Sequence, residues 1–183
     1  MRIAIDIDST LHDYWPAFAA AAKRRFGVEL AYEEQVTWEI LQLRSEQVRA
    51  VVHETHRDDN VLAAVPYPGA VDAIRGWKAA GHWILVASHR IPEANQATGR
   101  WLDKIGLPYD DLYCGFDKVT HAIEAGIEVL IDDSPKTLTR ALDEGMKVAT
   151  LLHPWNRDLC ETEDIVFADD WTDLAAKLEP VLA

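Results

Sequence analysis

Apolar residues occur along this chain in short runs that alternate with amphipathic stretches, a pattern typical of parallel α/β proteins. Strands are predicted at 3–7, 83–87, 112–114, 129–131 and 148–152, and helices at 68–80, 92–105, 118–125, 135–144 and about 171–178. Glycines directly follow four of these helices, as expected of helix C-termini. The pattern therefore predicts a Rossmann-like α/β core with a parallel five-stranded sheet.

The interval between the first two strands is too long for a simple crossover, which needs little more than a dozen residues and short loops. Within it, helical patterns are predicted at 16–26, 33–43 and 45–56. We therefore expect an α/β core made of residues 1–11 and 67–183, with a small helical insert at 12–66. The insert would lie over the carboxyl edge of the sheet, where open α/β sheets bind ligands.

Polar residues of types that serve in catalysis or ligand binding occur where predicted strands end or a helix begins. Asp6 and Asp8 close the first strand, Ser88 closes the second, Lys118 begins a helix, and Asp132 and Asp133 close the fourth strand. Because the carboxyl ends of parallel strands share one edge, all of these side chains can converge there.

Such a cluster favours a metal and a phosphoryl group. Carboxylates this close would raise one another's pKa, and a divalent cation removes that conflict. Oxygen ligands without His or Cys favour Mg²⁺ over zinc. In a strand, residues i and i+2 face the same side, so the carboxylates of Asp6 and Asp8 can act together. One of them can attack phosphorus while the other transfers protons.

The segments Asp6-Ile7-Asp8-Ser9-Thr10-Leu11 and Ile131-Asp132-Asp133-Ser134, with Ser88 and Lys118 between them, resemble the four motifs of the haloacid dehalogenase (HAD) superfamily of phosphohydrolases. The insert resembles the C1-type helical cap of that superfamily. Three further segments are similar to the 5'(3')-deoxyribonucleotidase group. They are Pro68-Gly69-Ala70, Ile131 to Pro135, and His153-Pro154-Trp155-Asn156-Arg157.

This resemblance implies a Mg²⁺-dependent phosphomonoesterase that acts through an aspartyl-phosphate, with a nucleoside or deoxynucleoside monophosphate as the favoured substrate. Asp6 would be the nucleophile and a metal ligand, and Asp8 the general acid/base and a metal ligand through its carbonyl. Asp133 would bind the metal directly and Asp132 through water, with the order in that pair left open. Phosphate-binding residues would be Ser88, Lys118, His89 and Arg90. The superfamily usually has Gly at the position of Ser9.

Aromatic residues of the insert are candidates for contact with the leaving group. Trp15, Phe18 and Trp38 can stack on a base, although packing between cap and core is the competing interpretation. His53 and His56 are three residues apart, which is not the spacing of H-E-x-x-H. Their segment is interpreted as a solvated helix face.

The charge of the chain limits its partners. Its 183 residues include 18 Lys plus Arg and 31 Asp plus Glu, for a net charge of −13. So acidic a chain is expected to bind neither nucleic acid nor a membrane surface. Only two cysteines, no long apolar run and acidic residues near the start together predict a cytoplasmic protein. The pattern leaves open whether it is a monomer or a homodimer.

Four alternatives remain open. The protein can be a HAD phosphatase for a sugar phosphate or another small phosphate ester, or a haloacid dehalogenase, against which Asp8 argues. A phosphate-receiving signalling domain uses similar residues in a different order and has no long insert at this point. A non-catalytic phosphate-binding protein on the same fold is the fourth alternative.

Overall fold

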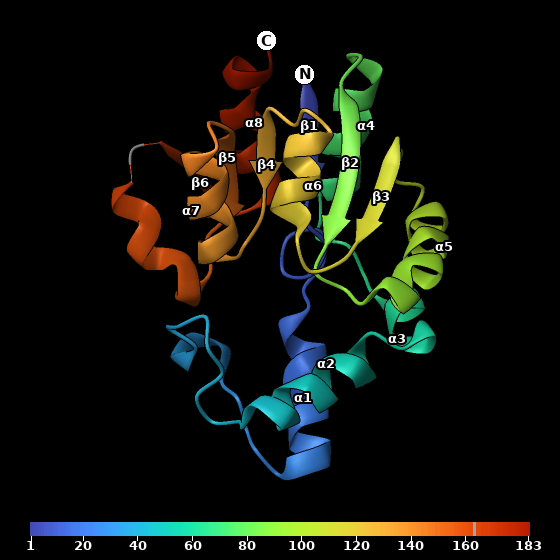
Figure 1. Cartoon of the computed structure of the whole chain (residues 1–183), viewed down its shortest axis with the longest axis vertical. Coiled ribbons are helices and arrows are strands. Elements are labelled where there is room, and N and C mark those ends of the chain that lie inside the picture. Colours follow the sequence, from blue (N-terminus) through green and yellow to red (C-terminus); the bar gives the residue numbers. More distant parts are fainter. Residues whose placement is uncertain (163) are drawn as a thin grey trace.

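The computed structural model describes residues 1–162 and 164–183. Its centre is one parallel sheet of six strands in the order β3-β2-β1-β4-β5-β6 (Figure 1). The strands are β1 (Arg2–Ile5), β2 (Trp83–Ser88), β3 (Asp111–Cys114), β4 (Val129–Ile131), β5 (Lys147–Leu151) and β6 (Ile165–Ala168). The predicted parallel α/β core is confirmed.

The predicted number of five strands is wrong, because Ile165–Ala168 pairs with β5 as a sixth strand. This strand lies at the edge of the sheet, and its two middle residues are only half-buried. An edge strand of four residues has a weaker apolar signal than a central strand that is buried on both faces.

Helices cover both faces of the sheet. Ile3 and Ile5 point into one core with helices α4 (Ala70–Ala79), α5 (Asn95–Ile105) and α8 (Trp171–Leu182). Ala4 points into the other core, with α6 (Lys118–Glu124) and α7 (Pro135–Asp143). This alternation within β1 explains why the central strand is apolar throughout. Short 3-10 helices, η2 (Pro92–Ala94) and η3 (Pro154–Glu161), complete the core.

The insert after β1 contains α1 (Trp15–Phe26), η1 (Tyr32–Glu34), α2 (Ser45–Thr55) and α3 (Asp58–Ala63). In Figure 1 the strand arrows of β2 and β3 point toward the side of the molecule on which α1 and α2 lie. We call the segment 14–56, which contains α1, α2 and the loop 27–44 between them, the cap. Its apolar residues, Trp15 and Phe18 among them, cluster with Trp155 of the core.

The predicted helix at 33–43 is wrong. Only Tyr32–Glu34 forms a 3-10 turn, and the chain then follows an irregular path. The buried side chain of Gln35 donates its amide hydrogens to the carbonyl oxygens of Thr37 at 2.6 Å and Glu39 at 3.0 Å. These bonds satisfy carbonyl groups that a helix would otherwise pair, so the loop is stable without helical structure.

Helix α3 is fastened to the core rather than to the cap. Arg100 on α5 forms an ion pair with Asp58 at 2.6 Å. The Trp101 indole nitrogen donates to the Ala64 carbonyl oxygen at 2.9 Å, and Lys104 donates to the Leu62 carbonyl oxygen at 2.8 Å. The end of α2 is therefore held at a defined place above α5. Among the described residues, none of the helices has the length and apolarity needed to cross a membrane.

Candidate active site at the carboxyl edge of the sheet

A tight turn after β1 presents the first two acidic residues. Asp6 donates its backbone N–H to the Ile131 carbonyl oxygen at 2.9 Å, which keeps it beside β4. The next residues wrap around the Ile7 carbonyl oxygen, which accepts N–H groups from Thr10, Leu11 and His12 at 2.8–3.2 Å. Ser9 has φ of +62°, the left-handed region. That conformation explains why glycine suits this position, and the protein forms the turn without one.

Three carboxylates meet at this turn. One oxygen each from Asp6, Asp132 and Asp133 lies within 4.8 Å of the others, and all three residues are buried. Burial, with Asp132 and Asp8 nearby, raises the pKa of Asp6 to about 6, although Lys118 opposes the shift. Burial and the charge of Asp6 also raise the pKa of Asp133 well above its ordinary value. The cluster is thus short of positive charge.

Lys118 compensates only part of the negative charge of the three carboxylates. Its ammonium, 1 % exposed, lies 2.6 Å from Asp6 Oδ1 and 2.5 Å from Asp132 Oδ2. Burial alone would lower the pKa of Lys118, but the charges of Asp132 and Asp6 raise it above its ordinary value. Asp132 Oδ1 accepts the Ser134 N–H at 2.9 Å, so both of its oxygens have protein partners. Asp133 has no cationic partner among the described residues.

The oxygen-rich donor set fits Mg²⁺. Its ligands would be carboxylate and carbonyl oxygens, and three buried carboxylates face a single ammonium, so a divalent cation balances the charge. Because Lys118 and Ser134 occupy the oxygens of Asp132, the carboxylate of Asp133 is better placed than that of Asp132 to bind a metal directly.

Asp8 lies apart from this cluster, in a group of cationic and donor side chains. Arg90, 2 % exposed, donates from Nη2 to Asp8 Oδ1 at 2.6 Å and from Nε to Oδ2 at 3.1 Å. His12 Nε2 lies 2.9 Å from Oδ1, and His56 Nε2 lies 3.2 Å from Oδ2. Although burial alone would raise it, Arg90 and the two histidines hold the pKa of Asp8 well below its ordinary value.

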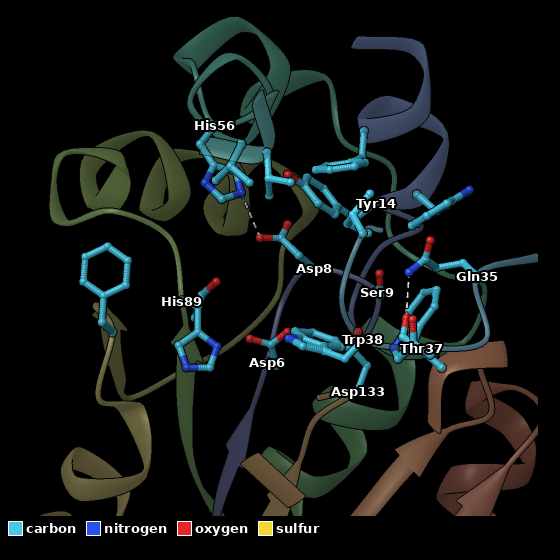
Figure 2. A pocket seen from close by; sticks show the side chains of 18 residues that line it. Asp6, Asp8, Ser9, Tyr14, Gln35, Thr37, Trp38, His56, His89 and Asp133 are labelled. Atoms are coloured by element: carbon cyan, nitrogen blue, oxygen red, sulfur yellow. Dashed lines mark hydrogen bonds and ion pairs between the residues drawn. The ribbon is translucent and has the colours of Figure 1, made fainter. Parts of the chain in front are cut away.

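A cavity of about 340 Å³ opens from Asp6 and Asp8 into the space between cap and core. In Figure 2, Asp6 and Asp133 lie below Asp8, with Tyr14 and Gln35 of the insert on one side and His89 on the other. Further apolar and aromatic residues complete the wall: Trp15, Phe18, Ile40, Val48, Val52, Phe116 and Trp155. Once a divalent cation neutralises the carboxylates at one end, a cavity with aromatic walls elsewhere suits a ligand with an anionic group and a planar apolar body.

The candidate residues from the sequence fall into three positions. Asp6, Asp8, Asp133, Ser88 and His89 line the cavity, and so do Trp15, Phe18 and Trp38. Lys118 and Asp132 lie beneath them in the ion-pair network. The guanidinium of Arg90 contacts Asp8 and the Thr98 hydroxyl.

The sequence did not reveal several wall residues. Trp155 belongs to the segment 153–157 that resembles the deoxyribonucleotidase group. Its place at the cavity, however, depends on η3, which brings it against the cap. His53 is exposed, as interpreted, whereas the interpretation of His56 as solvated is wrong because it is 8 % exposed and faces Asp8. The helix ends at Thr55, so His56 leaves the solvated face where the chain turns toward the core.

Comparisons with known proteins identify the family of the chain. The family model of "5' nucleotidase, deoxy (Pyrimidine), cytosolic type C protein" matches residues 1–179. No curated protein matches the chain significantly.

Solved structures share the fold. A HAD family hydrolase from Deinococcus radiodurans with bound phosphate and sodium is 18% identical, with a TM-score of 0.68 and coverage of 99% of this chain and 96% of that one. A haloacid dehalogenase-like hydrolase from Streptococcus pneumoniae is 13% identical, with a TM-score of 0.69 and coverage of 97% and 98%. CbbY from Rhodobacter sphaeroides in complex with phosphate is 16% identical, with a TM-score of 0.64 and coverage of 94% and 95%.

Proposed function

Because the chain belongs to the 5' nucleotidase, deoxy (pyrimidine), cytosolic type C family of HAD phosphohydrolases, we propose that it hydrolyses (deoxy)nucleoside monophosphates with Mg²⁺. The observation that carries the proposal is the single cavity that joins the Asp6 and Asp8 carboxylates to an aromatic wall. The phosphate would lie at the carboxylates and the nucleoside against the aromatic residues. The protein would consist of the core, 1–11 and 67–183, and the insert, 12–66.

Asp6 is the proposed nucleophile. Its carboxylate oxygen attacks phosphorus, the bond between phosphorus and the ester oxygen breaks, and Asp8 delivers a proton to the leaving oxygen. Asp8 then takes a proton from the water that attacks the aspartyl-phosphate, which releases inorganic phosphate and restores Asp6. The Lys118 ammonium stays beside Asp6 and is close enough to stabilise the charge on the phosphoryl oxygens.

Ser88 and His89 are the proposed neutral contacts of the phosphoryl group, because both line the cavity beside Asp6. Mg²⁺ would be held by Asp6, Asp133 and the Asp8 carbonyl, with Asp132 in its outer shell. When bound, the cation would neutralise the phosphoryl oxygens and the carboxylate cluster.

The protonation of Asp8 has to change during this cycle. Arg90 and the histidines favour its ionised form in the free protein, which is the form that accepts a proton from water. A dianionic phosphate next to Asp8 raises its pKa, because a like charge disfavours ionisation. Binding of substrate therefore favours the protonated form of Asp8, which is the form that the first step requires. We assign Arg90 to this charge balance rather than to a contact with the phosphate, because its guanidinium is bonded to Asp8 and the Thr98 hydroxyl and does not line the cavity.

A phosphate-release screen tests the proposed function. Purified protein is incubated with a panel of nucleoside monophosphates and sugar phosphates, with Mg²⁺ and with EDTA, and released phosphate is measured. We expect Mg²⁺-dependent release from nucleoside monophosphates, with pyrimidine deoxynucleotides among the better substrates. Release from sugar phosphates and from no nucleotide would overturn the substrate assignment. Undiminished activity in EDTA would overturn the role of the metal.

A further inference from the structure

His56 is a buried histidine to which the mechanism above assigns no contact with substrate or metal. It directly follows the last residue of α2, and its ring packs on Tyr14 with ring centroids 5.6 Å apart. Its Nε2 lies 3.2 Å from Asp8 Oδ2, and Figure 2 shows the ring directed at that carboxylate. Among the described residues, neither ring nitrogen makes a well-aligned hydrogen bond. Within the part of the chain that the structure describes, Asp8 is the one acidic side chain in contact with this ring.

The position of His56 is fixed from two sides. On the cap side, the Tyr14 hydroxyl and Thr55 Oγ1 lie 2.6 Å apart, which ties the beginning of α1 to the end of α2. On the core side, α3 begins two residues later and is anchored to α5 by the ion pair of Asp58 with Arg100. A side chain held in this way can orient a partner, because little conformational freedom remains to be lost when they interact.

The contacts of Asp8 divide by origin. Oδ1 is contacted by His12 and Arg90, which lie in the turn after β1 and the loop after β2. Oδ2 is contacted by Arg90 Nε at 3.1 Å and by His56. Among the described residues, His56 is the one contact that the cap makes with this carboxylate. Both Asp8 and His56 line the cavity, so this contact lies next to the proposed leaving group.

We propose that His56 is a positioning residue through which the cap orients Asp8 Oδ2 toward the leaving oxygen. The proposal rests on the proposed acid/base role of Asp8. It implies that protonation of the leaving group is efficient only when α1 and α2 are seated on the core. The contact of 3.2 Å is expected to tighten when substrate fills the cavity, as contacts of catalytic groups commonly do.

The competing explanation is that His56 only packs cap against core. The dependence of the rate on the leaving group separates the two roles. Phenyl phosphate releases a basic phenolate that needs a proton, whereas p-nitrophenyl phosphate releases a stabilised phenolate that needs little help. A packing defect would impair both esters alike, but a misplaced acid would impair phenyl phosphate selectively.

The experiment compares kcat/KM for the two esters in four full-length variants, because kcat/KM reports formation of the aspartyl-phosphate and not its later hydrolysis, which is common to both esters. In His56→Ala we expect kcat/KM for phenyl phosphate to fall about 10- to 100-fold and kcat/KM for p-nitrophenyl phosphate to fall less than about 3-fold. His56→Gln places an amide nitrogen near the position of Nε2, so it should recover most of the loss, whereas His56→Asn is too short to do so. His53→Ala, on the exposed side of the same helix, should behave as wild type.

Equal losses on both esters in His56→Ala, or no recovery in His56→Gln relative to His56→Asn, would overturn the proposal. If His56→Ala does not fold, the comparison of the Gln and Asn variants decides the question alone. The wild-type protein provides the separate control. If it hydrolyses neither ester, the proposed phosphomonoesterase function fails, whereas activity without the selective loss removes only the role of His56.

Discussion

The Nε2 atom of His153 lies 2.7 Å from the carbonyl oxygen of Ser9, the residue that follows Asp8. A carbonyl oxygen can only accept, so Nε2 carries the proton and donates it. Nδ1 of the neutral ring is then the acceptor, and the Tyr32 hydroxyl donates to it at 2.7 Å. The contacts thus define the tautomer and join the cap, through Tyr32, to the turn that presents Asp6 and Asp8.

We expect His153 to make stability sensitive to acid. Burial lowers the pKa of His153 to about 4, from an ordinary value near 6.5. Below pH 6.5 the unfolded chain gains a proton that the folded protein binds only near pH 4. The contribution of His153 to the free energy of unfolding is therefore complete above pH 6.5. It decreases as the pH falls toward 4, by up to about 3 kcal/mol.

Urea unfolding of wild type and His153→Gln at pH 7, 5.5 and 4.5 measures this effect. The free energy of unfolding of wild type should exceed that of the variant at pH 7, and the difference should shrink as the pH falls. A difference that is constant over this range would contradict the assigned neutral tautomer. Tyr32→Phe, which removes one hydroxyl and leaves His153 in place, should keep most of the pH dependence of wild type, because burial is the largest cause of the lowered pKa of His153.

Ser9→Gly should leave the free energy of unfolding unchanged or raise it by up to about 1 kcal/mol. The reason is that Ser9 has φ of +62°, where a residue with a Cβ costs about 1–2 kcal/mol and glycine does not, while glycine loses more backbone entropy on folding. Ser9→Val should destabilise by more than that cost, because a β-branched residue fits this region worst. Thermal unfolding of the three proteins gives the order, and a less stable Gly variant than wild type would contradict it.

The order of strands and helices was predictable because central parallel strands are apolar on both faces and helices end at glycine. The acidic pairs were predictable as a cluster because the carboxyl ends of β1 and β4 are neighbours in the sheet. Both conclusions need only the short-range pattern and the topology of a parallel sheet.

The missed features depend on side-chain contacts that the spacing of apolar residues does not encode. The loop after Tyr32 depends on how Gln35 bonds to nearby carbonyl groups. The burial of His56 depends on where α2 ends and on the anchoring of α3 to α5. The contact of Trp155 with Trp15 depends on how the core and the cap pack together. A periodic pattern assigns a face of a helix, but it does not specify what lies opposite a helix end.

Asp6→Asn should abolish phosphate release while the protein remains folded. An amide at this position cannot form the aspartyl-phosphate, and we expect at least a 1,000-fold loss of kcat. The substitution removes one of three crowded carboxylates but also a partner of Lys118, so we expect a small change in melting temperature. Circular dichroism and the rate with p-nitrophenyl phosphate provide the measurement. Turnover at the wild-type rate would show that Asp6 is not the nucleophile.

Mg²⁺ should stabilise the protein through Asp133. A cation that binds the folded state at 100 times its dissociation constant adds about 2.7 kcal/mol to the free energy of unfolding. We expect a rise in melting temperature on titration with Mg²⁺, its loss in Asp133→Asn, and an unchanged rise in the control Asp103→Asn, which alters an exposed carboxylate on α5. An equal rise in Asp133→Asn and wild type would remove Asp133 from the ligand set.

Trp155 should contribute to binding of the nucleoside rather than of the phosphate. Its ring lies parallel to that of His153, with centroids 4.5 Å apart, and lines the cavity together with Trp15 and Trp38. Stacking of a base on an aromatic face is worth about 1–3 kcal/mol. In Trp155→Leu we therefore expect KM for a nucleoside monophosphate to rise about 10-fold and kcat to change less than about 3-fold.

Two comparisons separate this role from packing of the cap. Ribose 5-phosphate has no base, so any turnover of it should have the same kcat/KM in Trp155→Leu as in wild type. Trp155→Phe keeps an aromatic face and should retain most of the affinity for the nucleotide. If Trp155→Leu lowers kcat/KM equally for both substrates, Trp155 serves only to seat the cap, and the base must bind elsewhere along the aromatic wall.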